Sequence, residues 1–245
     1  MSVDVAELRA FYDSPLGAVS SRAIGRVIHR FWPDLRGLSV LGLGYATPFA
    51  ADLGSACERL TVFMPARQGA VRWPCDRPSA TALVDPLMVP LADGSVDRLL
   101  AVHALEAVED PAEFLHEIGR LLAPAGRAIV VCPNRRGLWA RMDSTPFGHG
   151  QPFSRSQLRR LMSRTLLVPE RWAETLYVPP LRSRFVLSGA GAWERFGAAL
   201  SLPFAGLHVV EATKPVHRPI LVRQRRRLRY GSPILVPAPA SPAAG

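Results

Sequence analysis

The sequence predicts an α/β fold: a doubly wound, seven-stranded, mostly parallel sheet with helices on both faces. Short apolar runs of strand length, such as 38–41 and 127–132, alternate with amphipathic segments of helix length. Strands that are apolar on both sides are typical of a parallel sheet buried between two helical layers. The chain has 245 residues, of which 48% are hydrophobic, enough for one domain with a sizeable core.

The elements follow in order from periodicity and capping residues. A short helical arm over 1–16 precedes an amphipathic helix over 17–32, which Pro33 ends. Strands are expected at 38–41, 59–64, 80–85, 97–102, 127–132, 171–178 and 207–212. Helices are expected at 48–56, from the Asp110 cap to about 122, and over 154–165 and 185–200, with a short helix or turn at 66–73.

Composition excludes several classes of protein. No run of about 18 uncharged apolar residues is present, so no membrane span is expected. The first seven residues contain acids and lack the basic and apolar regions of a signal peptide. The three cysteines have no metal-ligand spacing, and their odd number argues against a disulfide framework. We therefore expect a cytoplasmic protein without a metal site.

The net charge of +10 is unevenly distributed. Residues 1–134 hold 12 arginines against 15 acidic residues, whereas residues 135–245 hold 17 arginines and one lysine against 5 acidic residues. A basic second half favours an acidic partner, which could be an anionic small molecule, a nucleic acid or a membrane surface. The near-absence of lysine also fits a GC-rich genome, so only the location of the arginines is informative.

Four segments carry a family resemblance. They read VLGLGYATP at 40–48, DPLMVPLADGSVD at 85–97, HALEAVEDP at 103–111 and LAPAGRAIVVCPN at 122–134. In this order and at this spacing they resemble the class I S-adenosylmethionine-dependent methyltransferases of the type-11 branch, which have a Rossmann-like fold. The resemblance implies S-adenosylmethionine as cofactor and an enzyme that transfers its methyl group to an undetermined small molecule, for which the basic second half makes an acidic compound the candidate.

The resemblance assigns cofactor contacts residue by residue. Gly44 keeps the glycine that lets the backbone approach the amino-acid end of the cofactor. Asp85 matches the residue that accepts a hydrogen bond from the adenine amino group. Leu87 and Met88 are expected to flank the adenine as apolar walls. His103 ends the strand that lies under the methionine portion. The remaining positions of the expected cofactor site are Gly42, Tyr45 and Met64.

The first motif departs from the family pattern. Gly42 stands where an aspartate is usual, and Ala46 and Pro48 replace two glycines. The acid that binds both ribose hydroxyls is absent, because Met64 or Pro65 takes its place. A bidentate carboxylate–diol contact is among the stronger polar contacts such a cofactor makes, so its loss bears directly on cofactor affinity.

Methyl transfer depends mostly on in-line geometry and exclusion of water, with a base only where the nucleophile must lose a proton. His103 and His149 are the candidate bases. Candidate substrate contacts come from the N-terminal arm and from the segment after the fifth strand, where arginines could bind an anionic group. They are Tyr12, Asn134, Arg135 and Arg136.

We expect four regions: an N-terminal arm and cap (1–37), a cofactor-binding half (38–134), a substrate-facing half (135–222) and a basic, Pro/Ala-rich mobile tail (223–245). Three alternatives to the enzyme stay open. A methyltransferase-like binding or regulatory protein fits the altered first motif. A nucleic-acid methyltransferase or binder fits the arginine-rich half. A dinucleotide oxidoreductase would explain the Gly-x-Gly turn but not the other blocks. The oligomeric state is undetermined.

Overall fold

The protein is described by a computed structural model that defines residues 3–76, 78–181, 183–199 and 204–215. The expected basic tail, 223–245, lies outside these described residues. Seven strands form one sheet: β1 (Ser39–Gly44), β2 (Arg59–Pro65), β3 (Thr81–Val84), β4 (Val96–Val102), β5 (Leu122–Pro133), β6 (Val168–Thr175) and β7 (Leu207–Thr213).

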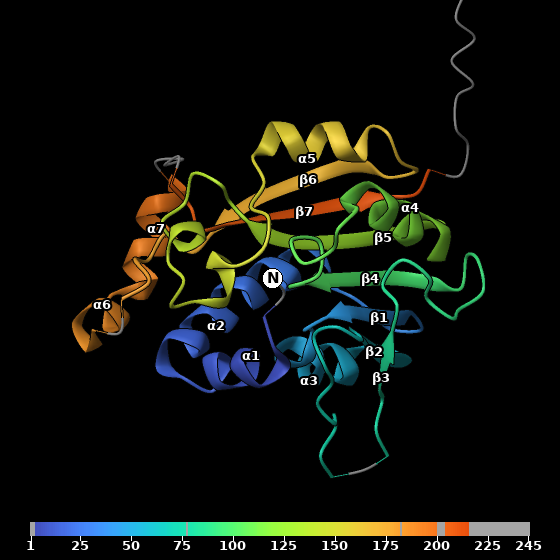
Figure 1. Cartoon of the computed structure of the whole chain (residues 1–245), viewed down its shortest axis with the longest axis horizontal. Coiled ribbons are helices and arrows are strands. Elements are labelled where there is room, and N and C mark those ends of the chain that lie inside the picture. Colours follow the sequence, from blue (N-terminus) through green and yellow to red (C-terminus); the bar gives the residue numbers. More distant parts are fainter. Residues whose placement is uncertain (1–2, 77, 182, 200–203, 216–245) are drawn as a thin grey trace, which may run out of the picture.

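The predicted fold class is confirmed. The strand order is β3-β2-β1-β4-β5-β7-β6; β1 to β5 run parallel, while β7 is antiparallel to both β5 and β6 (Figure 1). The chain winds outward from β1 to β3 and then returns to place β4 on the other side of β1. Ligands of such sheets bind beyond the carboxyl ends of the strands at this reversal, here between β1 and β4.

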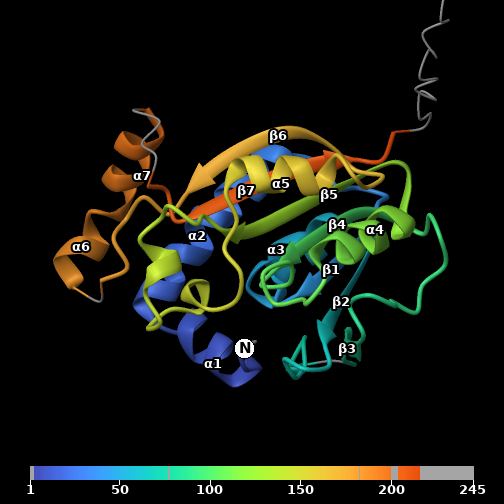
Figure 2. The same ribbon diagram turned by 45° about the horizontal axis from the view of Figure 1, so that its top comes forward.

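Helices cover both faces of the sheet (Figure 2). On one face lie α2 (Pro15–Phe31) and α3 (Thr47–Ala56), and on the other lie α4 (Pro111–Leu121) and α5 (Arg155–Met162). The α4 helix begins as its sequence predicts, because the Asp110 side chain accepts from the N–H groups of Ala112 and Glu113. The remaining elements are α1 (Val5–Tyr12), η1 (Trp139–Arg141), η2 (Pro146–Gly148), α6 (Arg184–Ser188) and α7 (Ala190–Ala199).

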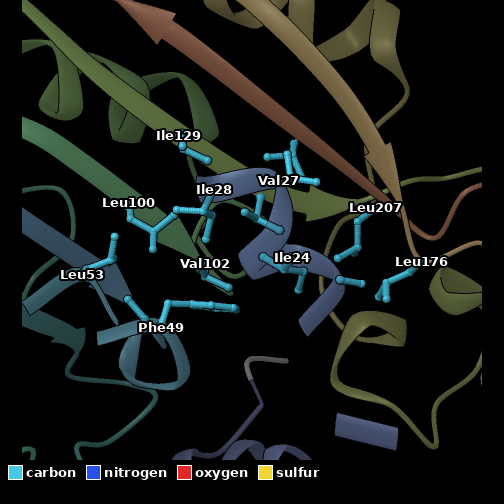
Figure 3. Packing of buried hydrophobic residues seen from close by; sticks show 14 of the residues in the cluster. Ile24, Val27, Ile28, Phe49, Leu53, Leu100, Val102, Ile129, Leu176 and Leu207 are labelled. Atoms are coloured by element: carbon cyan, nitrogen blue, oxygen red, sulfur yellow. The ribbon is translucent and has the colours of Figure 1, made fainter. Parts of the chain in front are cut away.

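Alternation along the strands divides the core into two clusters. Leu100, Val102 and Ile129 face α2 and α3, whereas Leu99 and Val130 face α4 and α5. Figure 3 shows the first cluster, in which Ile24, Val27 and Ile28 of α2 pack over the strands beside Phe49 and Leu53 of α3. None of the described helices combines the length and apolar character that crossing a membrane requires.

Several expected boundaries were wrong. The two expected N-terminal helices are present, but the first ends at Tyr12 rather than at 16, and the second begins at Pro15, which Ser14 caps, rather than at 17. The sixth strand covers Val168–Thr175 rather than 171–178, and Leu176, with a positive φ of 60°, follows it. The stretch 185–200 contains two helices rather than one, and the short helix or turn expected over 66–73 is a turn at 66–68.

A buried carboxylate fixes α2 to the antiparallel edge of the sheet. Glu211 of β7 is fully buried, and its oxygens accept from Trp32 Nε1 at 3.0 Å and from Arg171 Nη2 at 2.7 Å. Arg127 Nη1 donates to the same carboxylate at 3.1 Å. Arg171 also donates to the carbonyl oxygen of Phe31, the last residue of α2. One charge therefore holds three strands and a helix end together.

We predict that Glu211→Ala lowers the free energy of unfolding by about 3–5 kcal/mol, because it leaves two guanidiniums and an indole N–H facing an empty position. Urea unfolding followed by circular dichroism measures the change. Glu170→Ala, which removes an exposed partner of the same Arg127, should cost less than about 1 kcal/mol. Equal effects of the two substitutions would contradict this account of the contact.

Candidate functional site

The turn after β1 lies directly against the end of β4. Gly44 has a φ of +85°, and a Cβ atom there would stand 2.2 Å from the carbonyl oxygen of Val102. The Tyr45 N–H donates to that same oxygen at 2.8 Å. Only glycine combines this backbone conformation with so close an approach. The turn is therefore held at the point where the sheet topology predicts a ligand.

The two altered motif positions are spatially coupled. A Cβ atom on Gly42 would lie 2.8 Å from the Cβ atom of Ala46 and 3.3 Å from Val62. The methyl group of Ala46 thus lies where a side chain at position 42 would begin. An aspartate at 42 would therefore require a glycine at 46. These two departures from the family pattern compensate for each other in packing.

Aromatic side chains fill the space beside this turn. The Tyr12 ring, at the end of α1, stacks on Tyr45 with centroids 5.6 Å apart and meets Phe49 edge-on. On its other side Tyr12 meets the His103 ring, which lies 4.6 Å from Phe147. These rings come from four separated stretches of sequence, and α1 closes the cluster from outside.

A buried polar chain runs through the cluster. The Tyr12 hydroxyl lies 3.0 Å from His103 Nε2, and His103 Nδ1 lies 3.4 Å from Glu106 Oε1. Burial, and then the nearby Glu106 charge, hold the pKa of Tyr12 well above its usual value. His103 has a positive φ of 51°, uncommon for a residue with a side chain and often found where function over-determines the backbone.

Two side chains here have unmet hydrogen-bonding capacity. Both carboxylate oxygens of Glu106 are buried and have no hydrogen-bond partner among the described residues. Gln68 donates to the carbonyl oxygen of His103 at 3.3 Å, while its own buried Oε1 accepts from no described group. Such orphaned atoms cost free energy unless a ligand or water satisfies them. Neither residue was among the site residues predicted from the sequence. Their only signal is position, because Gln68 lies three residues after the end of β2 and Glu106 three residues after His103.

A pocket of about 240 Å³ opens at the ends of β2 and β3. Asp85 and Leu87 lie in its wall, and the Asp85 carboxylate accepts from the Leu87 N–H at 2.9 Å. An ion pair between Arg67 and Glu109 joins two further residues of the wall. The lining comprises Pro65, Ala66, Arg67, Gln68, Val84, Asp85, Pro86, Leu87, Ala107, Val108 and Glu109.

Two residues expected at the cofactor lie outside this pocket. Met64 is fully buried in the α2 and α3 core, and its sulfur accepts from the Val71 N–H at 3.4 Å. Met88 is 77% exposed and does not reach the lining. The alternation of β2 turns residue 64 into the core, and the Asp85–Leu87 turn leaves Met88 outside, so neither forms a wall here.

The expected substrate-side residues lie in two other places. The His149 Nε2 atom is 2.9 Å from the carbonyl oxygen of Asp143, and the residue lines a separate hollow beside α1. The Asn134 side chain is buried and spans the carbonyl oxygen of Ala205 and the Arg136 N–H, which makes it a loop brace. Arg135 and Arg136 are exposed, and Arg136 borders a groove lined by further arginines.

Comparisons with known proteins agree with this geometry. Residues 42–130 match the family model described as "Methyltransferase domain", of the type-11 class. This part of the chain is therefore similar to type-11 methyltransferase domains. This confirms the resemblance that the sequence motifs indicated. A comparison with curated proteins finds no match.

Solved structures share the fold of this methyltransferase domain. An S-adenosylmethionine-dependent methyltransferase from Thermotoga maritima has 18% identity and a TM-score of 0.62, over 86% of this chain and 95% of that one. The geranyl diphosphate C-methyltransferase of Streptomyces coelicolor A3(2) has 15% identity and a TM-score of 0.51, over 74% and 71%. The cyclase SpnF has 16% identity and a TM-score of 0.55, over 80% and 82%. At these identities the likeness establishes the fold alone.

S-adenosylmethionine is the cofactor of this family, and its two ends fit the methyltransferase domain differently. The pocket between Gln68 and Leu87 offers apolar walls and the Asp85 carboxylate, which suits an adenine. The methionine end would belong beside Gly44 and His103, where the Tyr12 ring stands in this conformation. That half therefore fits only when Tyr12 has moved. Within the described chain, no three metal-ligating side chains gather into a metal site.

We predict that Tyr12→Phe lowers the free energy of unfolding by about 1–2 kcal/mol, since it keeps the ring stack and leaves His103 Nε2 without its partner. Thermal and urea unfolding measure the loss. Tyr177→Phe is the control, because no hydrogen bond of that hydroxyl to a described residue is found. No loss in Tyr12→Phe, or an equal loss in both variants, would show that the Tyr12–His103 contact does not stabilise the fold.

Proposed function

We propose that the chain is an S-adenosylmethionine-dependent methyltransferase that acts on an anionic small molecule. The observation that carries the proposal is the buried carboxylate of Glu106, which accepts no hydrogen bond from a described residue and has His103 Nδ1 3.4 Å from its Oε1. A buried carboxylate without hydrogen bonds is expensive, and a cationic ligand would offset that cost. S-adenosylmethionine has a sulfonium and an ammonium group, and these positive charges complement the carboxylate of Glu106.

The residues of the pocket and of the neighbouring His103 cluster have separate roles. Asp85 and Leu87 bind and orient the adenine, and Gln68 Oε1 accepts a hydrogen bond from a hydroxyl group of the cofactor. The cofactor supplies an electrophilic methyl group when bound. With Nδ1 of His103 directed to Glu106, Nε2 is the ring atom that can take a proton. In this structure the Tyr12 hydroxyl is hydrogen-bonded to His103 Nε2.

An anionic substrate fits the charge distribution near this compartment. Exposed Arg135 and Arg136 follow the carboxyl end of β5, which pairs with β4, the strand that ends just before His103. Guanidinium groups bind carboxylates and phosphates through paired donors. The Streptomyces coelicolor structural neighbour was solved with a geranyl thiolodiphosphate, an anionic ligand.

A second candidate is a methyltransferase-like binding protein without catalytic activity. The Tyr12 ring, which occupies the space expected for the methionine end of the cofactor, favours this candidate. Gly42 and the absence of the ribose-binding acid at Met64 or Pro65 favour it as well. In that case the Tyr12–Tyr45 stack is permanent, and the domain does not take up the cofactor. The two candidates differ in one property, which is whether S-adenosylhomocysteine binds.

We predict that S-adenosylhomocysteine binds the purified chain and binds Tyr12→Ala more tightly, because the variant no longer has to displace the ring. Isothermal titration calorimetry measures both affinities. Ala66→Trp, which fills the pocket wall, should weaken binding by at least about tenfold, whereas Ala92→Trp on an exposed turn away from this pocket should not. No binding to either the native chain or Tyr12→Ala at millimolar concentration would favour the binding-protein alternative.

We further predict that Glu106→Gln weakens S-adenosylmethionine binding by about tenfold or more and leaves the unfolded fraction no larger than in the native chain. The substitution removes a buried charge that only a cationic ligand would offset. Glu113→Gln, an exposed glutamate at the start of α4 that does not line the pocket, serves as the control. Unchanged affinity in Glu106→Gln would remove the central support of the proposal.

A further inference from the structure

A second concave site lies at the antiparallel edge of the sheet. Residue alternation on β7 directs His208 to the face that carries α5, together with Val210. There the beginnings of α5 and β7 and the ends of β5 and β6 enclose a groove of about 740 Å³, within the usual range for small-molecule sites. Its lining comprises Arg30, Asn134, Arg136, Ser154, Arg155, Ser156, Arg159, Trp172, Ala173, Glu174, Tyr177 and His208.

The groove carries a clear excess of positive charge. Four arginines line it, at 30, 136, 155 and 159, and within the described chain none of them forms a salt bridge with a carboxylate. The guanidiniums of Arg155 and Arg159 lie 5.0 Å and 6.0 Å from the centre of the Trp172 ring. This cation–π contact holds two charges over one wall and leaves their N–H groups free for a ligand.

Glu174 is the one acidic residue of the lining. Burial raises the pKa of its carboxyl group, while Arg155 lowers it by a smaller amount. A single half-buried acid does not neutralise four guanidiniums. The groove is therefore complementary to an anion of more than one negative charge.

His208 is the independent sign that the groove accepts a polar ligand. The side chain is 2% exposed, yet neither ring nitrogen has a hydrogen-bond partner among the described residues. Its nearest acidic atom, Glu174 Oε1, lies 3.5 Å from Nδ1. Burial, and then Arg155, lower the pKa of His208 to about 4, so the ring is neutral near pH 7. A neutral ring has one N–H to donate and one nitrogen to accept, and both are unmet.

The beginning of α5 adds donors at the same place. Ser154 caps the helix in a complete capping box with Gln157, and Arg155 and Ser156 form its first turn within the groove. Free N–H groups and the helix dipole at such a terminus favour a negative charge. Donors thus approach the groove from α5, from the arginines and from His208.

We propose that this groove binds a phosphate-bearing small molecule, with Arg155 and Arg159 on the phosphate oxygens and His208 donating to the ligand at the floor. The concave form and the buried imidazole favour a compact phosphate over the extended backbone of a nucleic acid or a membrane surface. Binding of the anion stands without the methyltransferase reaction. Its role as the methyl acceptor, by contrast, rests on the proposed function.

The test is a calorimetric titration with inorganic pyrophosphate at 150 mM NaCl, using the native chain and three variants. We expect binding to the native chain, a loss of about tenfold or more in Arg155→Ala and His208→Phe, and a change below about twofold in Arg160→Ala. Arg160 is an exposed arginine of the same helix that does not line the groove, so it matches the charge change. Unfolding curves of the variants separate lost binding from lost structure.

Three outcomes would overturn the proposal. Equal losses in Arg155→Ala and Arg160→Ala would mean diffuse charge attraction only. No binding at 10 mM pyrophosphate would mean that the groove does not take phosphate. Tighter, Arg155-dependent binding of a 20-base-pair DNA duplex or of phosphatidylserine vesicles than of pyrophosphate would assign the surface to a macromolecule. S-adenosylhomocysteine affinity should stay unchanged in all three variants, so failure here and failure of the proposed function are distinguishable.

Discussion

The approach of the β1 turn to the end of β4 determines the arrangement of the candidate site. The turn can rest on the carbonyl oxygen of Val102 because residue 44 has no Cβ atom and adopts a positive φ. This contact holds the Tyr45 N–H on the carbonyl oxygen of the residue before His103, and the Tyr45 ring carries the stack with Tyr12. Without it, Tyr12 would lose the ring on which it stacks. The site therefore depends on one close backbone contact at the topological switch point.

The same region explains how a family motif can change while the fold persists. Position 42 lacks the side chain that is usual in the family, and the methyl group of Ala46 occupies the space where that side chain would begin. The rings of Tyr12 and Tyr45 then fill volume beside the turn, and Tyr12 reaches His103, which lies next to the buried carboxylate of Glu106. A compartment meant only for packing would be cheaper with an apolar residue at 106. The retained charge is the physical argument for a ligand.

Sequence reasoning succeeded where the signal was local. The capped helix at Asp110, the apolar strands and the position of Asp85 beside Leu87 follow from patterns within a few residues. It failed where the determinant was distant. Tyr12 and His103 are 91 positions apart, and no periodicity reveals their contact. The arginines at 155 and 159 look like an ordinary solvated helix face until Trp172 and His208 are placed beside them. Met64 shows the same limit, because its motif position predicts a cofactor contact, whereas strand alternation directs its side chain into the core.

The most direct test of the account is a crystal structure of the chain grown with S-adenosylhomocysteine. The account predicts adenine between Gln68 and Leu87, the amino-acid end beside Gly44 with its ammonium near Glu106, and the Tyr12 hydroxyl withdrawn from His103 Nε2. A structure in which Tyr12 still stacks on Tyr45 and the ligand is absent from this pocket, or bound elsewhere, would contradict it.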